Sequence, residues 1–236
     1  MRAASAPMLP SKTQEFGAPD FDRLVRAYRW MEYLSFGPAL MRTRIAFLAE
    51  LAGCRDALIF GDGDGRFTAR LLGTNPAIRI DAIDASAAML RALVGHAGRN
   101  APRVHTEAID ARAWQPTNTE PYDLIISHFF LDCLTTAEIQ SLAAKIRAAS
   151  APDAIWVISE FAVPRSGFGR VVAGAVVTAL YFAFGLLTGL RIRNLPDHAG
   201  ALTRAGFRLV ARRTSLAGLL TSELWTARCR RMLQTC

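Results

Sequence analysis

The chain has few of the residues that build disulfides or metal sites. Its 236 residues include only four cysteines and four histidines. No Cys-x-x-Cys pair occurs, and no histidine stands at metal-ligand spacing from a cysteine. We therefore predict neither a disulfide framework nor a metal site. Thiols this widely spaced favour a reduced, cytoplasmic protein. The cysteines are Cys54, Cys133, Cys229 and Cys236.

Lysine is almost absent, since only Lys12 and Lys145 occur and arginine supplies nearly all of the positive charge. The formal net charge of +8 permits attraction to anionic membranes, nucleic acid or acidic substrates, but it identifies none of them. Hydrophobic residues make up 51% of the chain, which excludes a disordered protein and suffices for one buried core.

The ends of the chain are predicted to lie outside a single domain. The first residues lack the long apolar core of a secretory signal, and their Pro, Ser and Ala content is typical of a flexible lead over residues 1–19. One domain is expected over residues 20–228, and a basic tail over 229–236.

Short apolar runs alternate with helical stretches along the domain. Residues 21–52 have helical periodicity, with a second helix expected to start at Pro38. Thr135 and Glu138 form a capping-box pattern at the start of another helix. The alternation predicts an α/β fold with a mostly parallel sheet and helices on both faces. Strands are expected at 57–60, 78–83, 104–109, 122–127, 154–161, 207–211 and 219–227, and the later helices at 66–72, 85–97, 135–149 and up to Leu202.

Residues 171–190 contain no charged side chain, and arginines flank them on both sides. A helix rising about 1.5 Å per residue would be long enough to cross a bilayer here. Such a span would separate the two closing strands from the rest of the sheet and leave its edge exposed. We therefore favour a helical lid insertion over about 165–195, with a helix resting peripherally on the membrane surface as the alternative.

Three alternate glycines, Gly61, Gly63 and Gly65, stand between an apolar strand and a helix. Residues without side chains allow a sharp turn and let a ligand approach the amides at the helix N-terminus. Arg66 occupies the place of the third glycine of the dinucleotide fingerprint, and no Lys-Ser/Thr pair follows to complete a phosphate-binding P-loop. Asp62 and Asp64 would repel a pyrophosphate, so the turn suits a ligand that carries positive charge.

Two further acids follow the next strands. Asp84 ends the second strand, where its carboxylate can accept both hydroxyl protons of a ribose, and Asp110 follows the third, where it can accept from an adenine amino group. All of these groups fall at the carboxyl ends of strands, where open α/β sheets bind their ligands. A single aspartate here would be explained by helix capping, but the ordered series indicates a binding site.

This constellation resembles the class I S-adenosylmethionine-dependent methyltransferases over about residues 21–227, and is closest in pattern to the quinone-biosynthesis-like small-molecule branch. The resemblance implies a Rossmann-like, seven-stranded, mostly parallel sheet with an antiparallel terminal strand, N-terminal helices and S-adenosyl-L-methionine as cofactor. Asp62 replaces a more usual small or neutral residue, and Asp132 stands where a histidine is common. The cofactor-binding residues implied are Gly61, Asp62, Gly63, Gly65, Asp84, Ala85, Met89, Asp110, Ala111, Ser127 and His128.

The methyl donor is already a strong electrophile, so the protein mainly aligns the reactants and excludes water. His128, Asp132 and Glu160 are candidate catalytic bases because they lie at or after the ends of central strands, although packing, helix capping and a structural hydrogen bond are the respective alternatives. A small, apolar or lipid-like acceptor is expected. Its pocket would be lined by Tyr28, Tyr33, Phe129, Tyr181 and Phe182, with ordinary core packing of these aromatics as the alternative.

Other functions fit less well. A catalytically degenerate binding or assembly protein would keep the fold without turnover, and a nicotinamide-dependent oxidoreductase would need the missing third glycine. Nucleic acid is not an expected partner, because the fourth strand is followed by Ser127-His-Phe-Phe130 and not by an Asn/Asp-Pro-Pro-aromatic motif. The oligomeric state and the atom methylated are left open by the sequence.

Overall fold

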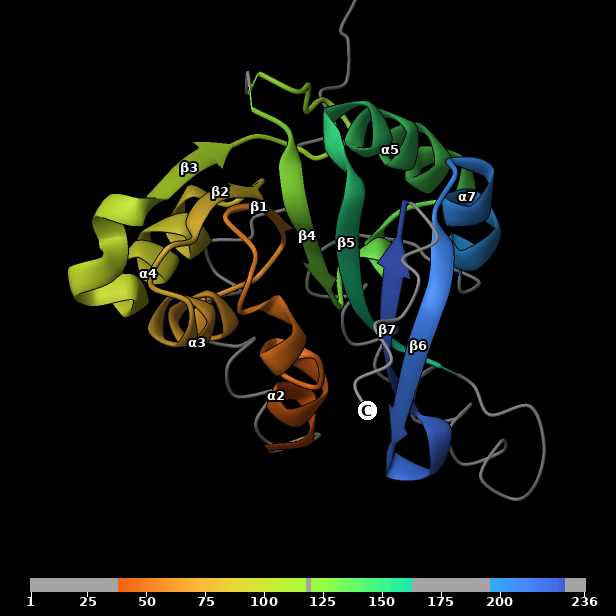
Figure 1. The fold of residues 1–236 in the computed structure, drawn as a ribbon, viewed down its shortest axis with the longest axis horizontal. Helices are drawn as coiled ribbons and strands as arrows, with labels where there is room; N and C mark the ends of the chain where they lie inside the picture. The colour runs from red at the N-terminus through yellow and green to blue at the C-terminus, as the bar shows by residue number, and fades with distance from the viewer. Residues whose placement is uncertain (1–37, 118–119, 163–195, 228–236) are drawn as a thin grey trace, which may run out of the picture.

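The structure, a computed structural model, describes residues 38–117, 120–162 and 196–227. Strands and helices alternate along these residues as the apolar runs predict (Figure 1). The strands are β1 (Asp56–Phe60), β2 (Arg79–Asp84), β3 (Val104–Ala108), β4 (Tyr122–His128), β5 (Ser150–Phe161), β6 (Arg208–Ser215) and β7 (Leu220–Thr226). The helices are α2 (Pro38–Arg44), α3 (Arg66–Thr74), α4 (Ala87–Ala97), α5 (Thr136–Ala149) and α7 (His198–Arg204), with short 3-10 turns at Leu48–Leu51, Gly98–Arg103, Leu131–Cys133 and Leu216–Gly218.

The strands form one seven-stranded sheet in the order β3-β2-β1-β4-β5-β7-β6. The first five pair in parallel, whereas β7 runs antiparallel to both β5 and β6. This confirms the predicted sheet with its antiparallel terminal strand. The carboxyl ends of β1, β2, β4 and β5 consequently meet at one edge, which the loops after these strands form.

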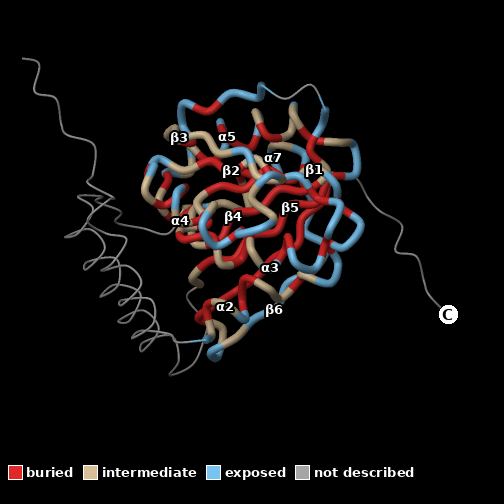
Figure 2. The backbone as a smooth tube through the Cα atoms, turned by 90° about the vertical axis from the view of Figure 1, so that its left-hand side faces the viewer, coloured by how far each residue is buried: buried red, intermediate tan, exposed pale blue. Residues whose placement is uncertain are grey.

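Helices cover both faces of the sheet, and each face buries its own apolar cluster. The cluster beneath α3 and α4 contains Phe67, Leu71 and Leu93, whereas the cluster beneath α5 and α7 contains Trp156, Ile139 and Leu202. The strands contribute alternate residues to the two clusters because successive side chains point to opposite faces. The most deeply buried backbone runs through the central strands (Figure 2).

The chain between Pro38 and Leu51 is less helical than its periodicity suggests. Helix α2 begins at Pro38, as predicted, but it ends at Arg44 and is followed by a turn and a 3-10 segment, Leu48–Leu51. The expectation of one continuous helix to residue 52 was therefore wrong. Phe47 and Leu51 are buried although the helix has ended before them. The apolar spacing of this segment is therefore compatible with one helix or with two shorter segments.

Helix α5 has the capping box that its sequence predicts. The Thr135 hydroxyl accepts from the backbone N–H of Glu138, and a Glu138 carboxylate oxygen accepts from the backbone N–H of Thr135 at 2.7 Å. The two contacts satisfy otherwise unpaired donors at the helix start. They fix the point at which the chain leaves the loop after β4.

The ends of the chain and the apolar run lie outside the described residues. The expected flexible lead, the basic tail, the lid over about 165–195 and the aromatic residues Tyr28, Tyr33, Tyr181 and Phe182 all fall there. Within 38–117, 120–162 and 196–227, no helix has the length and apolar character needed to span a bilayer.

Candidate functional site

The predicted site residues gather at the carboxyl edge of the sheet. The glycine turn follows β1, Asp84 ends β2, His128 ends β4, and Glu160 lies at the end of β5. Because β1 pairs with both β2 and β4, and β4 pairs with β5, four successive strand ends meet here. A ligand at this edge can contact all four loops, as is usual for open α/β sheets.

The glycine turn has a backbone that only glycine adopts readily. Gly61, Gly63 and Gly65 have φ angles of +64°, +60° and +81°. A Cβ on Gly61 would lie 2.5 Å from the Phe130 ring, and a Cβ on Gly65 would lie 2.5 Å from the Cα of Leu93 in α4. The turn is therefore shaped by both backbone conformation and close packing. It delivers the chain directly to the first residue of α3.

Asp62 is buried inside the turn and is bonded to the start of α3. Its Oδ2 accepts from the backbone N–H of Thr68 at 2.9 Å and from the Thr68 hydroxyl at 2.7 Å. Its Oδ1 is buried and has no hydrogen-bond partner among the described residues. Burial raises the pKa of Asp62 to about 6, although the nearby Arg44 cation acts in the opposite direction. Asp62 Oδ2 thus fixes the glycine turn to the start of α3, whereas Oδ1 makes no hydrogen bond with the described residues.

Asp84 presents a partly exposed carboxylate at the end of β2. Its Oδ1 accepts from the backbone N–H of Ser86 at 2.8 Å, which orients the group at the strand end. Burial and the neighbouring Asp62 raise the pKa of Asp84 to about 6, with the Ser86 hydrogen bond opposing. A hydroxyl-rich or cationic ligand here would stabilise the ionised form.

Asp110 lies in the turn after β3 and is already paired. Its carboxylate takes hydrogen bonds from Arg112, with Nε 2.9 Å from Oδ1, and these contacts hold the pKa of Asp110 below its usual range. The backbone carbonyl of Asp110 accepts from Ala113 and Trp114, which closes the turn. In the adenine-binding role implied by the resemblance, the Asp110 carboxylate would have to accept hydrogen bonds from Arg112 and from the adenine amino group at the same time.

The remaining expected cofactor contacts differ in how exposed they are. Ala85 is exposed, whereas Met89 and Ala111 are buried beside the loops that contain Asp84 and Asp110. Ser127 is fully buried and its hydroxyl accepts from the Trp156 indole N–H at 2.9 Å. The Ser127 side chain therefore belongs to the core, and a cofactor contact there would have to come from backbone.

His128 lies on the face of the sheet beneath α2 and α3. It is buried, and its ring meets Phe67 of α3 edge-on at 4.5 Å between centroids. Neither ring nitrogen has a hydrogen-bond partner among the described residues. Burial and the Arg44 cation hold the pKa of His128 well below its usual range, so the imidazole is neutral.

Arg44 is the site residue that sequence analysis missed. It is buried at the end of α2, lies close enough to act electrostatically on both Asp62 and His128, and has its guanidinium 5.4 Å from the centre of the Phe129 ring. A buried arginine beside a buried aspartate compensates part of the cost of removing each from water. The one signal in the sequence for burial of Arg44 is its position in a segment with helical periodicity, next to apolar residues.

Asp132 and Glu160 form a buried acidic pair on the other side of the edge. Glu160 and His128 lie on opposite faces of the sheet. Ser159, which precedes Glu160 in β5, pairs with His128, and its hydroxyl donates to the Thr43 carbonyl of α2. Because successive side chains of a strand alternate between faces, Glu160 points to the other face. Glu160 Oε1 accepts from the backbone N–H groups of Phe130 and Leu131, at 3.2 and 2.8 Å. Its Oε2 is buried without a partner among the described residues.

The negative charge of Asp132 also acts on its neighbours. Burial, reinforced by Asp132, raises the pKa of Glu160 well above its usual range. The Cys133 thiol contacts Asp132 Oδ1 at 3.6 Å, and burial raises the pKa of that thiol as well. Both shifts favour the uncharged forms, the carboxylic acid of Glu160 and the thiol of Cys133. The three predicted bases do not converge, since His128 lies apart from the two carboxyls.

Phe129 has a strained backbone directly after β4, with φ of +54°. Its ring lies 5.0 Å from that of Phe161 at the end of β5, and both side chains are partly exposed. Positive φ is unusual for a bulky residue and occurs mainly where surrounding structure imposes it. The two rings give this part of the edge an apolar surface.

The strand order and the site define the class of protein. A seven-stranded sheet in the order 3-2-1-4-5-7-6, with β7 antiparallel and a glycine turn after β1, is the class I methyltransferase fold. Residues 58–156 match the family model of the methyltransferase domain. The chain therefore has the class I methyltransferase fold, and its central residues match a methyltransferase domain, as its motifs predicted.

Solved structures of methyltransferases share this fold. The mitomycin 7-O-methyltransferase MmcR is 16% identical, with a TM-score of 0.65 over 90% of this chain and 61% of that one. An O-methyltransferase family protein from Burkholderia thailandensis is 17% identical, with a TM-score of 0.60 over 87% of this chain and 57% of that one. The N,N-8-amino-8-demethyl-D-riboflavin dimethyltransferase RosA from Streptomyces davawensis is 20% identical, with a TM-score of 0.57 over 89% of this chain and 62% of that one.

At these identities the likeness establishes the fold. The chain spans less than two thirds of the length of each of these three proteins. No curated protein matches the sequence at a significant level.

The residues of the edge fit S-adenosylmethionine, the cofactor of this class. Asp62 and Asp84 are carboxyls with raised pKa values, so a ligand with a sulfonium and an ammonium group would supply the positive charge that favours their ionised forms. Asp84 is partly exposed at the end of β2, so its carboxylate can accept hydrogen bonds from the hydroxyls of a ligand. The glycine turn presents backbone in place of side chains to the same ligand.

Proposed function

We propose that the protein is an enzyme that transfers the methyl group of S-adenosylmethionine to a hydroxyl oxygen of a small, apolar organic acceptor. The observation that supports this most strongly is the buried carboxyl pair, Asp132 and Glu160, beside the cofactor loops. A hydroxyl acceptor must lose a proton as it is methylated, and a carboxylate held next to a protonated partner is suited to receive it.

The cofactor, when bound, supplies an electrophilic methyl group on a positively charged sulfur. The chain would hold it with the amides of the glycine turn and with the Asp84 carboxylate. In the transfer, a bond forms between the acceptor oxygen and the methyl carbon as the carbon–sulfur bond breaks. The acceptor's proton passes to the Asp132 carboxylate, and the bonding electrons stay on sulfur, so charge and atoms balance.

Glu160 acts on this step through position and charge. Its two hydrogen bonds from Phe130 and Leu131 fix the loop that presents Asp132. Because Glu160 is neutral, it lets the neighbouring Asp132 remain ionised, as two close carboxyls cannot both carry a charge cheaply. Asp132 is therefore the proposed base and Glu160 a positioning residue.

An apolar acceptor is supported by the aromatic surface at the ends of β4 and β5. Phe129 and Phe161 are half-buried and lie within 5.0 Å of each other, so they can cover an apolar ring while Asp132 meets its hydroxyl. An oxygen acceptor agrees with the printed names of MmcR and of the Burkholderia protein, whereas RosA, by its name, is a dimethyltransferase of an amino compound.

The proposal is tested by following transfer of radiolabelled methyl from S-adenosylmethionine to a panel of phenols, quinols and matched aryl amines. We expect phenols or quinols to be labelled, and Asp132→Asn to lower kcat by about 100-fold or more with little change in KM, because a general base contributes 10²–10⁴ in rate. Asp153→Asn, on an exposed part of β5, should leave kcat unchanged.

Two results would contradict this assignment. Labelling confined to amines would overturn the oxygen acceptor. Tight binding of the cofactor without turnover on any member of the panel would support a binding protein that keeps the fold. A variant Glu160→Gln that shifts the acid limb of the pH–rate profile but keeps KM supports the positioning role, because Asp132 still titrates as the base; an unchanged profile would overturn that role.

A further inference from the structure

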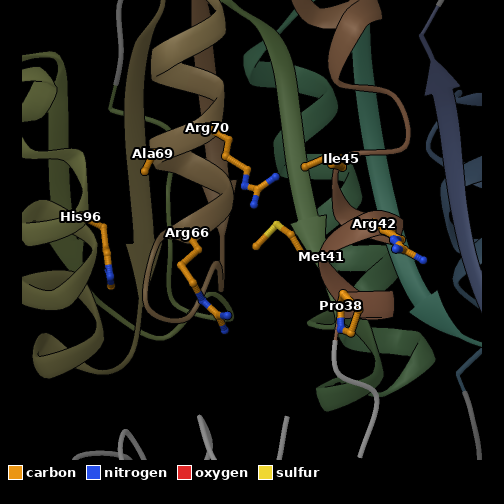
Figure 3. A pocket seen from close by; sticks show the side chains of 8 residues that line it. All are labelled: Pro38, Met41, Arg42, Ile45, Arg66, Ala69, Arg70 and His96. Atoms are coloured by element: carbon orange, nitrogen blue, oxygen red, sulfur yellow. The ribbon is translucent and has the colours of Figure 1, made fainter. Parts of the chain in front are cut away.

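A groove of about 750 Å³ lies between α2 and α3, and none of the residues expected to bind the cofactor lines it. Figure 3 shows Arg66 and Arg70 on the α3 side, with Met41 and Ile45 facing them from α2 and the segment just after it. Ala69 and Arg70 belong to the second turn of α3, beyond the amides that follow the glycine turn. None of the described residues that line the groove is acidic.

The two arginines on the α3 wall of the groove differ in how far their charge is already balanced. Arg66 donates from Nε to the Asp64 carboxylate at 2.9 Å, so part of its charge is already balanced. Arg70 is exposed and makes no ion pair with the described residues. The His96 ring adds a polar group from α4, with Nδ1 2.8 Å from the Asp64 carbonyl. Arginine guanidinium groups in such a cluster match the geometry of a phosphate group.

The opposite wall is formed by α2 and the segment after it. Its apolar residues are Met41 and Ile45, and the exposed Arg42 lies beside them. Met41 and Ile45 are partly exposed, and neither can satisfy a charged ligand. Inorganic phosphate would use the arginines and leave this wall in contact with water. A ligand that joins a phosphate to an apolar substituent would cover both walls at once, because burial of apolar surface is favourable.

We propose that the groove between α2 and α3 binds a phosphate ester with an apolar substituent, with Arg70 as its main anchor and Met41 as its apolar contact. The groove adjoins the glycine turn through Arg66 and His96, but the proposal does not depend on the proposed acceptor. The same chemistry is offered by a soluble phosphate ester and by the headgroup region of an anionic phospholipid, and binding experiments separate the two.

The full chain is titrated with monomeric dihexanoylphosphatidic acid, with inorganic phosphate, and with vesicles of phosphatidylcholine with or without phosphatidylglycerol. The ester is expected to bind at least tenfold more tightly than inorganic phosphate. Arg70→Gln should weaken binding of the ester about tenfold, as loss of one charge-assisted contact does. Met41→Ser should weaken binding of the ester and leave that of inorganic phosphate unchanged.

Arg91→Gln is the matched control, because Arg91 is exposed on α4 and does not line the groove. It should change affinity less than twofold. The same variant pattern with phosphatidylglycerol vesicles would identify a lipid as the source, and binding of the monomeric ester alone would identify a soluble ligand. Equal losses in Arg70→Gln and Arg91→Gln, or no binding by folded protein to any probe, would overturn the proposal.

Discussion

Gly65→Ala is expected to destabilise the protein by about 2–6 kcal/mol and to abolish cofactor binding. A φ of +81° costs a residue with a Cβ about 1–3 kcal/mol. The new Cβ would also lie 2.5 Å from the Cα of Leu93, which is backbone and cannot move aside without shifting α4, and such overpacking costs about 1–3 kcal/mol more. Urea unfolding followed by circular dichroism measures the change.

Gly73→Ala is the matched control in the same helix. A Cβ at Gly73 meets nothing within 4 Å, and the residue has ordinary helical geometry. Because alanine is the better helix former, this variant should be more stable than the parent by about 0.5–1 kcal/mol. Equal midpoints for Gly65→Ala and Gly73→Ala would contradict the described packing of the turn.

Asp84→Asn is expected to weaken binding of S-adenosylhomocysteine about 100-fold or more. The carboxylate would accept two ribose hydroxyl protons, and each hydrogen bond to a charged group is worth about 1.5–3 kcal/mol. The substitution preserves shape, so the fold should be unchanged. Asp81→Asn serves as control, because Asp81 lies on the same strand but accepts from the Tyr122 hydroxyl at 2.6 Å, away from the site edge. Similar losses in both variants would contradict the assignment.

The pH dependence of that binding follows from the raised pKa of Asp84, which is about 6. Binding favours the ionised carboxylate, so affinity is complete above pH 6 and falls as Asp84 takes up a proton below it. One linked proton raises Kd by at most about tenfold per pH unit. Asp62 has a pKa of about 6 as well, so the profile of Asp84→Asn, which should be flatter than that of the parent, isolates the contribution of Asp84.

Much of the fold was predictable because its signals are local. Each described strand overlaps a segment that the sequence predicts as a strand, and the capping box at Thr135 marks the start of α5 from four consecutive residues. The antiparallel terminal strand came from the resemblance. The order of the strands in the sheet was not predicted, since pairing depends on contacts between distant parts of the chain. The early end of α2 at Arg44 could not be predicted, because burial of Phe47 and Leu51 requires only that they face the core.

The site was predictable where backbone constraints dictate the residue type. Three positive φ angles in five residues leave glycine as the natural choice, and the acids follow the strands that position them. Side-chain partnerships were not predictable. Ser127 in β4 accepts a hydrogen bond from Trp156 in the neighbouring strand β5. Arg44, in α2, acts electrostatically on Asp62 and His128. The approach of Asp132 to Glu160 depends on the register of β4 and β5.

The most direct test of the account is calorimetric titration of the full chain with S-adenosylhomocysteine at pH 7.5. The account predicts one site per chain with a dissociation constant in the micromolar range. A sample with native circular dichroism that gives no binding heat over that range, and no shift in melting temperature with the ligand, would contradict the assignment of the glycine turn and Asp84 as a cofactor site.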